Sequence, residues 1–358
     1  MTPEYKLPNY EIPYYEDNTR ISNSAIGWFL NKGPAYLRRM LDGEEKGLDL
    51  PQLRKGTMIH EFLLQPEEFQ KDYIVFEGVR PKSAQAQKFC EEYIKSTEIE
   101  PDKRAIGAYN KSYSIVGKSS EKILSEALKI SEECKDYIDV LKSGKILMSP
   151  YDYTQLLKIK SNVQNHKLAS KLLCDAGDYG DVHIYHEFQI NWDCLGVPCK
   201  SLLDCCMFDF ENRVCTIVDI KTTSKLYHFE DSMREFDYAR QLQFYKSAAG
   251  WWLNQHKAEI KSLTGEPYDD NTENAPYDFG ESFEYSEWTF KLYIVAIDNG
   301  SNGEVRVFDE SNKTYSDVRN KIRNALNDIK YHMTHNEWEH SIEYYTGDGS
   351  ENLKYDIV

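Results

Sequence analysis

Hydrophobic positions follow two different periods along the chain, and the change between them divides the sequence into regions. Between about 82 and 174, apolar residues recur at helical spacing in "AQKFCEEYI", "SSEKILSEALKISEECKDYIDVLKSG" and "SPYDYTQLLKIKSNVQNHKLASKLL". Ser149 and Asp152 have the spacing of a capping box, which predicts that the last of these helices begins there. We therefore expect an α-helical insertion at about residues 82–174.

At Gly177 the hydrophobic period shortens to two, which is typical of strands. The stretches "VHIYHEFQINW", "KSLLDCCMF" and "VCTIVDIKTT" predict three consecutive strands with turns at 196–198 and near 211. A helix, an acidic loop at 264–286, two more strands in "EWTFKLYIVAID" and "EVRVFDE", and an amphipathic helix at about 313–333 follow. This order predicts an α/β core, a mixed sheet flanked by helices.

The region before the insertion is predicted to be helical after an extended start. Residues 1–20 are rich in Pro and Tyr and form an extended lead-in. Ser22 and Ser24 are candidate caps of a short helix, Pro34 restarts a second one, and "LRKGTMIHEFLL" predicts a third. We expect residues 21–358 to form a single domain that carries the insertion.

Composition limits the classes of protein to which the chain can belong. No apolar run among the 358 residues approaches the ~20 needed to cross a bilayer, and the start does not resemble a signal peptide, so we expect a cytoplasmic protein without a membrane partner. Eight irregularly spaced cysteines indicate reduced thiols. A net charge of −16 speaks against a general nucleic-acid coat, although a local basic groove remains compatible with it. No P-loop motif is present, so we expect no built-in motor.

The predicted hairpin brings charged residues together. Side chains two apart on a strand point the same way, so Asp219 and Lys221 share a face. If Phe210 lies opposite Arg213, the register places Asp204 directly across from Asp219, whereas a slip of one residue would send it to the other face. Two carboxylates one strand apart form an oxygen-rich site suited to Mg²⁺ or Mn²⁺.

A lysine beside such a site suits phosphodiester hydrolysis. Lys221 could orient or deprotonate the attacking water and stabilise the charge that grows on a pentavalent phosphate. The Asp-x-Lys triplet is also common by chance, and the structural alternative is an ordinary salt bridge at the end of a strand.

Several motifs occur together in a set order. They are, in chain order, the helix with Gly56-x-x-x-His60, the strand with Asp204, the run Asp219-Ile220-Lys221 followed by Thr222, and the helix with Gln241-x-x-x-Tyr245. The set resembles the PD-(D/E)XK nuclease superfamily, and within it the RecB-like branch and the exonuclease VIII (RecE-type) recombination exonucleases, including phage-encoded ones. The resemblance covers about residues 20–335. One departure is "LLDC" around Asp204, where a Pro-Asp pair is usual.

The resemblance implies a role for each matched residue. It makes His60, Asp204, Asp219 and the Ile220 carbonyl metal ligands and makes Lys221 the catalytic lysine. An isolated histidine on an apolar helix is otherwise an ordinary half-buried residue, and this is the structural alternative for His60.

Further residues of the predicted site have less direct roles. Glu187 lies where these nucleases often have an acidic residue, to bind metal through water or to brace the lysine; its alternative is the solvent face of the strand. Gln241 and Tyr245 match the helix that lines the DNA path, and Thr222 and Arg240 are further candidate DNA contacts. The alternative is that Gln241 and Tyr245 are ordinary surface and core residues of this helix.

Two other metal centres are disfavoured. His183, His186, Cys194 and Cys199 suggest structural zinc, but the two histidines have opposite parity on one strand and should point to opposite faces. An iron-sulfur cluster in related nucleases draws cysteines from near the C-terminus, whereas the last cysteine here is Cys215.

The function implied by the resemblance is Mg²⁺-dependent, ATP-independent DNA hydrolysis, with Mn²⁺ as a possible substitute. It implies a 5′→3′ exonuclease on linear double-stranded DNA ends that leaves 3′ single strands for a single-strand annealing protein, and a ring-like homo-oligomer. Three alternatives remain open: a RecB-like endonuclease, a CRISPR-adaptation-type nuclease without an iron-sulfur cluster, and a non-catalytic DNA-binding or assembly protein on the same fold.

Overall fold

The structure is a computed structural model that describes residues 10, 12–47, 50–173, 182–256, 288–313 and 316–351. The chain divides into two compact units. The first, which we call the sheet unit, comprises Met1–Leu64 and Ile159–Val358, and the second, the helical unit, comprises Gln65–Lys158. The helical insertion expected at 82–174 overlaps the helical unit over residues 82–158. No helix in the described part of the chain is long and apolar enough to cross a membrane.

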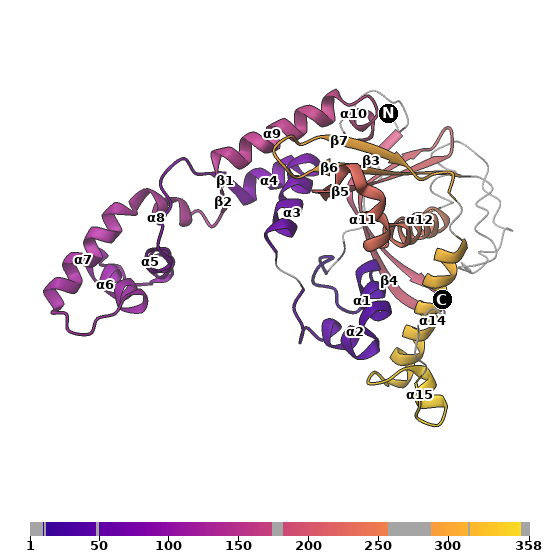
Figure 1. Ribbon diagram of the computed structural model, residues 1–358, viewed down its shortest axis with the longest axis horizontal. Coiled ribbons are helices and arrows are strands. Elements are labelled where there is room, and N and C mark those ends of the chain that lie inside the picture. The colour runs from indigo at the N-terminus through magenta and orange to yellow at the C-terminus, as the bar shows by residue number, and fades with distance from the viewer. Residues whose placement is uncertain are drawn as a thin grey trace. The chain divides into compact units, whose positions relative to one another are not determined.

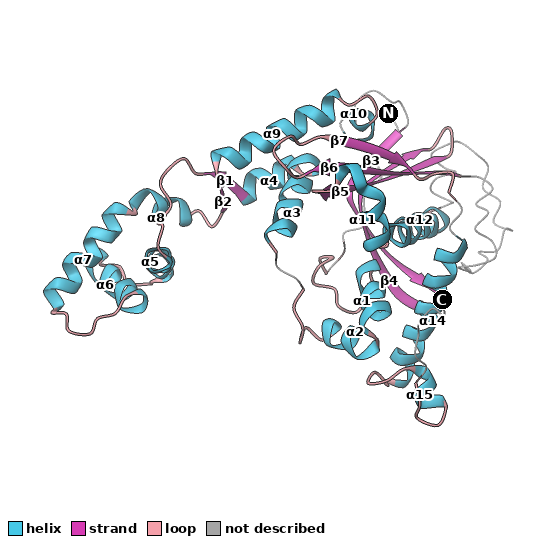
Figure 2. Ribbon diagram, viewed as in Figure 1, coloured by secondary structure: helices cyan, strands magenta, loops and turns pink. Residues whose placement is uncertain are grey.

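The sheet unit is built on a five-stranded mixed sheet (Figures 1 and 2). Its strands, in spatial order, are β3 (Val182–Cys194), β4 (Val197–Asp209), β5 (Val214–Thr223), β6 (Thr289–Asp298) and β7 (Val305–Asp309). Only β5 and β6 pair in parallel. All five strands were predicted from the sequence, and the mixed α/β class with a helix-flanked sheet is confirmed. The acidic loop expected at 264–286 lies outside the described residues.

Helices cover both faces of this sheet. On one face lies α12 (Tyr238–Gln255), which contacts four of the strands and is itself contacted by α14 (Ser316–His335). On the other lies α10 (Ala169–Leu173), whose Leu172 carbonyl accepts a hydrogen bond from Cys205. The next strand residue, Cys206, belongs to the core on the α12 side, because neighbours on a strand point to opposite faces. The seven described cysteines are all buried thiols.

The N-terminal helices follow the predicted pattern. Helix α1 (Asn23–Lys32) begins at Ser22, whose hydroxyl accepts a hydrogen bond from the Ala25 amide at 3.1 Å. Helix α2 (Pro34–Leu41) starts at a proline, and α3 (Pro51–Leu64) is the third helix. The chain before α1 joins the sheet unit where Ile21 pairs with Cys199 of β4.

One helix of the prediction is divided in two. Helix α11 (Phe229–Glu235) ends before α12 begins, because Asp237 adopts a left-handed conformation with φ of 52°. Asp237 is tied there to Arg240 at 3.0 Å and to Lys321 at 2.8 Å. The apolar period continues across this kink, so the sequence pattern did not reveal it. Short elements η1 (Leu226–His228) and α15 (Ile342–Thr346) complete the unit.

The helical unit has its own small core around Phe89, Tyr109 and Ala127. Its elements are α4 (Pro66–Asp72), β1 (Tyr73–Val75), α5 (Ala84–Lys95), α6 (Pro101–Ser112), α7 (Ser120–Glu133), α8 (Lys135–Leu141), β2 (Ile146–Met148) and the start of α9 (Pro150–Asn165). The parallel pair β1–β2 was not predicted, because three residues are too few to display a period. The capping box is confirmed: the Ser149 hydroxyl accepts from the Asp152 amide at 3.1 Å.

Candidate metal centre

The candidate site lies where two neighbouring strands separate. The ladder between β4 and β5 runs from Asp209–Val214 to Cys205–Val218, which is the predicted register, and ends there. Asp204 and Asp219 are the next residues on each strand. Beyond the ladder, the Ile220 amide donates to Asp204 Oδ2 at 2.6 Å. The Asp204 carboxylate thus accepts the amide hydrogen at a point where β4 no longer pairs with β5.

Glu187 meets Asp204 from strand β3 at a local distortion. His186 pairs with Cys205 and Phe188 with Leu203, so the two carboxylates lie opposite each other in the ladder. Glu187 nevertheless has φ of 48°, in the left-handed region that a non-glycine residue rarely adopts inside a strand. Such strain costs about 1–3 kcal/mol and often marks a functional position.

The distortion changes which side chains of β3 face the core. The rings of Tyr185 and Phe188 stack at 5.3 Å although they are three positions apart, whereas regular alternation would place them on opposite faces. Glu187 is half-buried beside Asp204 and is not simply on the solvent face of the strand. Burial, and then the charge of Asp204, raise the pKa of Glu187 to about 8.

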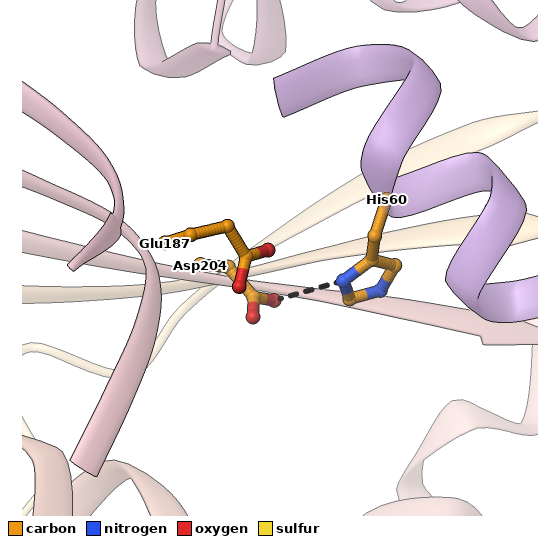
Figure 3. A group of neighbouring side chains, drawn as sticks. All are labelled: His60, Glu187 and Asp204. Carbon is orange, nitrogen blue, oxygen red and sulfur yellow. Dashed lines mark ion pairs between the residues drawn. The ribbon is translucent and has the colours of Figure 1, made fainter. Parts of the chain in front are cut away.

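His60 reaches the same point from helix α3. A Cβ atom at Gly56 would lie 3.0 Å from the Thr222 hydroxyl, so glycine allows α3 to approach β5 closely. One turn later, His60 Nδ1 lies 3.6 Å from Asp204 Oδ2 (Figure 3). Burial, and then the charge of Lys221, lower the pKa of His60 to about 4, so its imidazole is neutral, the form that binds metals.

These three residues form a group with the spacing of a metal centre. One ligand atom each from His60, Glu187 and Asp204 lies within 4.8 Å of the others. Figure 3 shows the two carboxylates and the imidazole converging from β3, β4 and α3. The described residues contain no second group of three such ligands.

Asp219 belongs to an adjoining hydrogen-bond network. Its carboxylate is 1% exposed and lies 2.7 Å from Lys221 Nζ. Gln241 of α12 donates to Asp219 at 3.1 Å and to the Tyr245 hydroxyl at 2.9 Å. Burial raises the pKa of Asp219 to about 6 against the effect of Lys221. Burial lowers the pKa of Lys221, but Asp219 and Asp204 together outweigh this and leave it raised, so the lysine is protonated.

The structure brings most of the predicted site residues together, but Arg240 is an exception. Arg240 is 5% exposed and bonds to the Asn23 carbonyl at 2.5 Å and to Asp237 at 3.0 Å. Its guanidinium is therefore used inside the protein, which corrects its assignment as a DNA contact. Thr222 packs against Gly56 of α3, so its contact in this structure is with the helix.

The alternative zinc residues do not converge. The His183 ring packs edge-on against Phe210, and His186 Nδ1 lies 2.9 Å from the Leu64 carbonyl. Cys194 and Cys199 are buried in the core on the α12 side.

Sequence reasoning missed one residue of the site, Tyr238. The Lys221 ammonium lies over its ring, 4.9 Å from the centroid. Tyr238, Gln241 and Tyr245 are spaced three and four residues apart along α12, so one face of this helix supports the Asp219–Lys221 pair. This spacing was visible in "YARQLQFY" and could have drawn attention to Tyr238.

No protein-family model matches the chain, and no curated protein matches it. A crystal structure of a candidate exonuclease from Eubacterium rectale is similar, with 12% sequence identity and a TM-score of 0.42. The similarity covers 99% of this chain and 97% of that one. At this level no family is assigned, and the chain is described as a mixed α/β protein with a candidate metal centre.

Proposed function

We propose that this chain is a metal-dependent, ATP-independent nuclease that hydrolyses DNA phosphodiesters. The observation that carries the proposal is the convergence of His60, Glu187 and Asp204 beside the ion pair of Asp219 and Lys221. Metal ligands and a protonated lysine in one half-buried place are what hydrolysis of a phosphodiester requires.

The chemistry of the donors fits a divalent cation. Carboxylate oxygens from Glu187 and Asp204 prefer Mg²⁺ or Mn²⁺, and the neutral imidazole of His60 adds a nitrogen ligand. Ligand atoms of the two carboxylates lie within 4.8 Å of each other, so the charged groups repel, and a bound cation would compensate for this repulsion. Asp219 and the Ile220 carbonyl, on the strand next to Asp204, are the further ligands that we propose.

Each side chain then has a distinct part in the reaction. These ligands would hold Mg²⁺, which would supply Lewis-acid activation of a water and of a phosphoryl oxygen. Lys221, fixed by Asp219 and by the Tyr238 ring, presents a positive charge to the phosphate. Because the lysine is protonated, we assign it charge stabilisation and water orientation in preference to proton abstraction. Gln241 holds the Asp219 carboxylate in place.

We further propose that the substrate is the end of a linear duplex, degraded 5′→3′ to leave 3′ single strands for an annealing protein. The polarity, the partner and a ring-like homo-oligomer are supported by the resemblance of the ordered motifs to recombination exonucleases. A ring also suits a chain with a net charge of −16, because enclosure can keep such a protein on DNA without strong attraction.

The proposal is tested by digestion of linear duplex DNA with 5′-phosphates in Mg²⁺ without ATP, beside a covalently closed circle of the same sequence. We expect the linear DNA to be degraded while the circle stays intact. We expect no degradation of either DNA when EDTA is present. Strand-specific end labels report the polarity.

Other results would lead to the alternatives. Cutting of the circle would identify an endonuclease. Absence of cutting in both Mg²⁺ and Mn²⁺, with DNA binding retained, would refute the nuclease proposal in favour of a binding protein.

A further inference from the structure

A line of stacked aromatic rings runs from the core of the sheet unit to its surface beside Lys221. Phe308 of β7 stacks on Phe229 at 5.0 Å and 9°, and Phe229 stacks on Tyr238 at 6.0 Å and 22°. Tyr238 in turn stacks on Phe236 at 5.6 Å and 29°. Each of these contacts joins one ring to the next, so Phe308, Phe229, Tyr238 and Phe236 form a connected series of rings.

The outer end of this line is open. Phe229 is 2% exposed, whereas Phe236 is 54% exposed. A phenylalanine ring with so much surface in water loses the hydrophobic stabilisation that burial of such a ring normally provides. The exposed part of this ring is accessible to a ligand.

The backbone next to Phe236 holds the ring in this position. Asp237 has a left-handed conformation, which is unfavourable for a residue with a side chain, and its carboxylate is held by Arg240 and Lys321. Two cations thus maintain the kink between α11 and α12 that directs Phe236 outward. The ring is presented by a fixed turn.

The line of rings also contacts the candidate site. The Lys221 ammonium lies over the ring of Tyr238, 4.9 Å from its centroid, and the same ammonium is 2.7 Å from Asp219. Phe236 is therefore an exposed ring that stacks on Tyr238, and Tyr238 is the ring beneath the Lys221 ammonium. A phosphodiester held by Lys221 would carry a nucleoside on each side, and the Tyr238 ring links this ammonium to Phe236.

We propose that Phe236 stacks on a nucleobase of the strand whose phosphate lies beside Lys221, which rests on the proposed nuclease function. The base continues the line of rings by one member. A base inside a duplex has both faces covered by its neighbours, so the base on Phe236 must be unstacked, and the strand enters the site in single-stranded form. The substrate class is thereby narrowed to a frayed or single-stranded DNA end. Stacking on a π-face also predicts little preference among the four bases.

The test compares an intact oligonucleotide with one that lacks bases. A fluorescein-labelled single strand is titrated with protein in Ca²⁺, which is used in place of Mg²⁺ to slow hydrolysis, and fluorescence anisotropy gives Kd. The second oligonucleotide has abasic sites at its three terminal positions. We expect wild-type protein to bind the intact strand about tenfold more tightly.

The variants isolate the ring. Phe236→Leu keeps an apolar side chain without a π-face and should bind both oligonucleotides equally, whereas Phe236→Trp should restore the difference. Tyr151→Leu, at an aromatic side chain of the helical unit that is 62% exposed, is the matched control and should behave as wild type. Circular dichroism and melting temperature establish that each variant is folded.

The outcomes separate this inference from the nuclease proposal. Equal binding of both oligonucleotides by wild-type protein that still digests linear DNA would overturn the role of Phe236 and leave the nuclease in place. A preference for the intact strand that persists in Phe236→Leu would also overturn it. If the wild-type protein neither cuts nor binds DNA, both proposals are refuted.

Discussion

Two lysine–carboxylate pairs in this chain have almost the same geometry and opposite electrostatics. In the sheet unit Lys221 lies 2.7 Å from Asp219 and 4.9 Å from the centroid of the Tyr238 ring. In the helical unit Lys118 lies 2.6 Å from Glu126 and 5.1 Å from the centroid of a tyrosine ring. Yet the pKa of Asp219 is raised to about 6, whereas that of Glu126 is lowered.

The surroundings of each pair account for the difference. The Glu126 side chain is 35% exposed, and its hydrogen bonds with Lys118 and then Tyr109 lower its pKa. Asp219 is buried, and burial together with the charge of Asp204 outweighs its lysine. A partly exposed carboxylate without an acidic neighbour is thus held in its charged form by its lysine. Where several carboxylates are buried close together, one lysine leaves an excess of negative charge. A bound cation would compensate for that excess.

The largest expected effect separates the two lysines by function. Lys221→Ala should lower the rate of linear duplex digestion by about 10²–10³-fold or more, because a preorganised charge at the phosphate is lost. Lys118→Ala should leave the rate within about twofold, since its pair lies on the surface of the helical unit. Initial rates at saturating DNA measure both, and similar losses in the two variants would contradict the assignment.

The next effect concerns the metal. We expect Mn²⁺ at one hundred times its Kd to stabilise the wild-type protein by about 2.7 kcal/mol, because ligands of the folded state stabilise it by mass action. Asp204→Asn should lose most of this shift, and Glu126→Gln should keep all of it. Differential scanning fluorimetry with and without Mn²⁺ reports the result, and a full shift in Asp204→Asn would exclude this centre.

A further effect appears in the dependence of stability on pH. The pKa of Glu187 is raised from 4.5 to about 8 in the folded protein, so the folded state binds an extra proton between these values. Stability should therefore fall as pH rises from about 5 to 8 in metal-free protein. Glu187→Gln should remove this loss and melt at a higher temperature than wild type at pH 8, with a smaller difference at pH 5.

Glu126 should behave in the opposite way. Its pKa is lowered in the folded state, so its stabilising contribution is present above its usual pKa and is lost as pH falls through the lowered value. Glu126→Gln should lower the melting temperature at neutral pH and have less effect in acid. If the two glutamine variants shift the melting temperature in the same direction at pH 8, the comparison fails.

The smallest effect tests the helix that carries His60. Gly56→Ala places a Cβ 3.0 Å from the Thr222 hydroxyl, so either this side chain or α3 must give by a few tenths of an ångström, and we expect activity to fall several-fold. Thr222→Ala removes that hydroxyl and should restore activity in the double variant. Gly107→Ala, in a helix of the helical unit with nothing within 4 Å, should only gain stability, by up to about 1 kcal/mol.

The parts of the site that depend on period and register could be predicted from the sequence. The hairpin register that places Asp204 across from Asp219 follows from the length of a tight turn and from strand alternation, both of which are local. The approach of the Gly56-x-x-x-His60 helix was expected only from the resemblance to a family, since no local rule brings α3 to β5.

The parts of the site that depend on strained backbone or on tertiary partners could not be predicted from the sequence. Glu187 and Asp237 both have positive φ, a conformation that residue type alone does not indicate for an acidic residue inside a strand or a helical stretch. Arg240 looks like a surface cation in the sequence and is buried because α1 supplies the Asn23 carbonyl. The sequence pattern of α12 does not reveal that partner.

The most direct test of the central claim, that His60, Glu187 and Asp204 form a metal centre beside Lys221, is a crystal grown with Mn²⁺ and measured at the manganese absorption edge. We predict an anomalous peak within coordination distance of the His60 imidazole and the Asp204 carboxylate. A peak elsewhere, or none while Glu187 and Asp204 share a proton in a direct hydrogen bond, would contradict it.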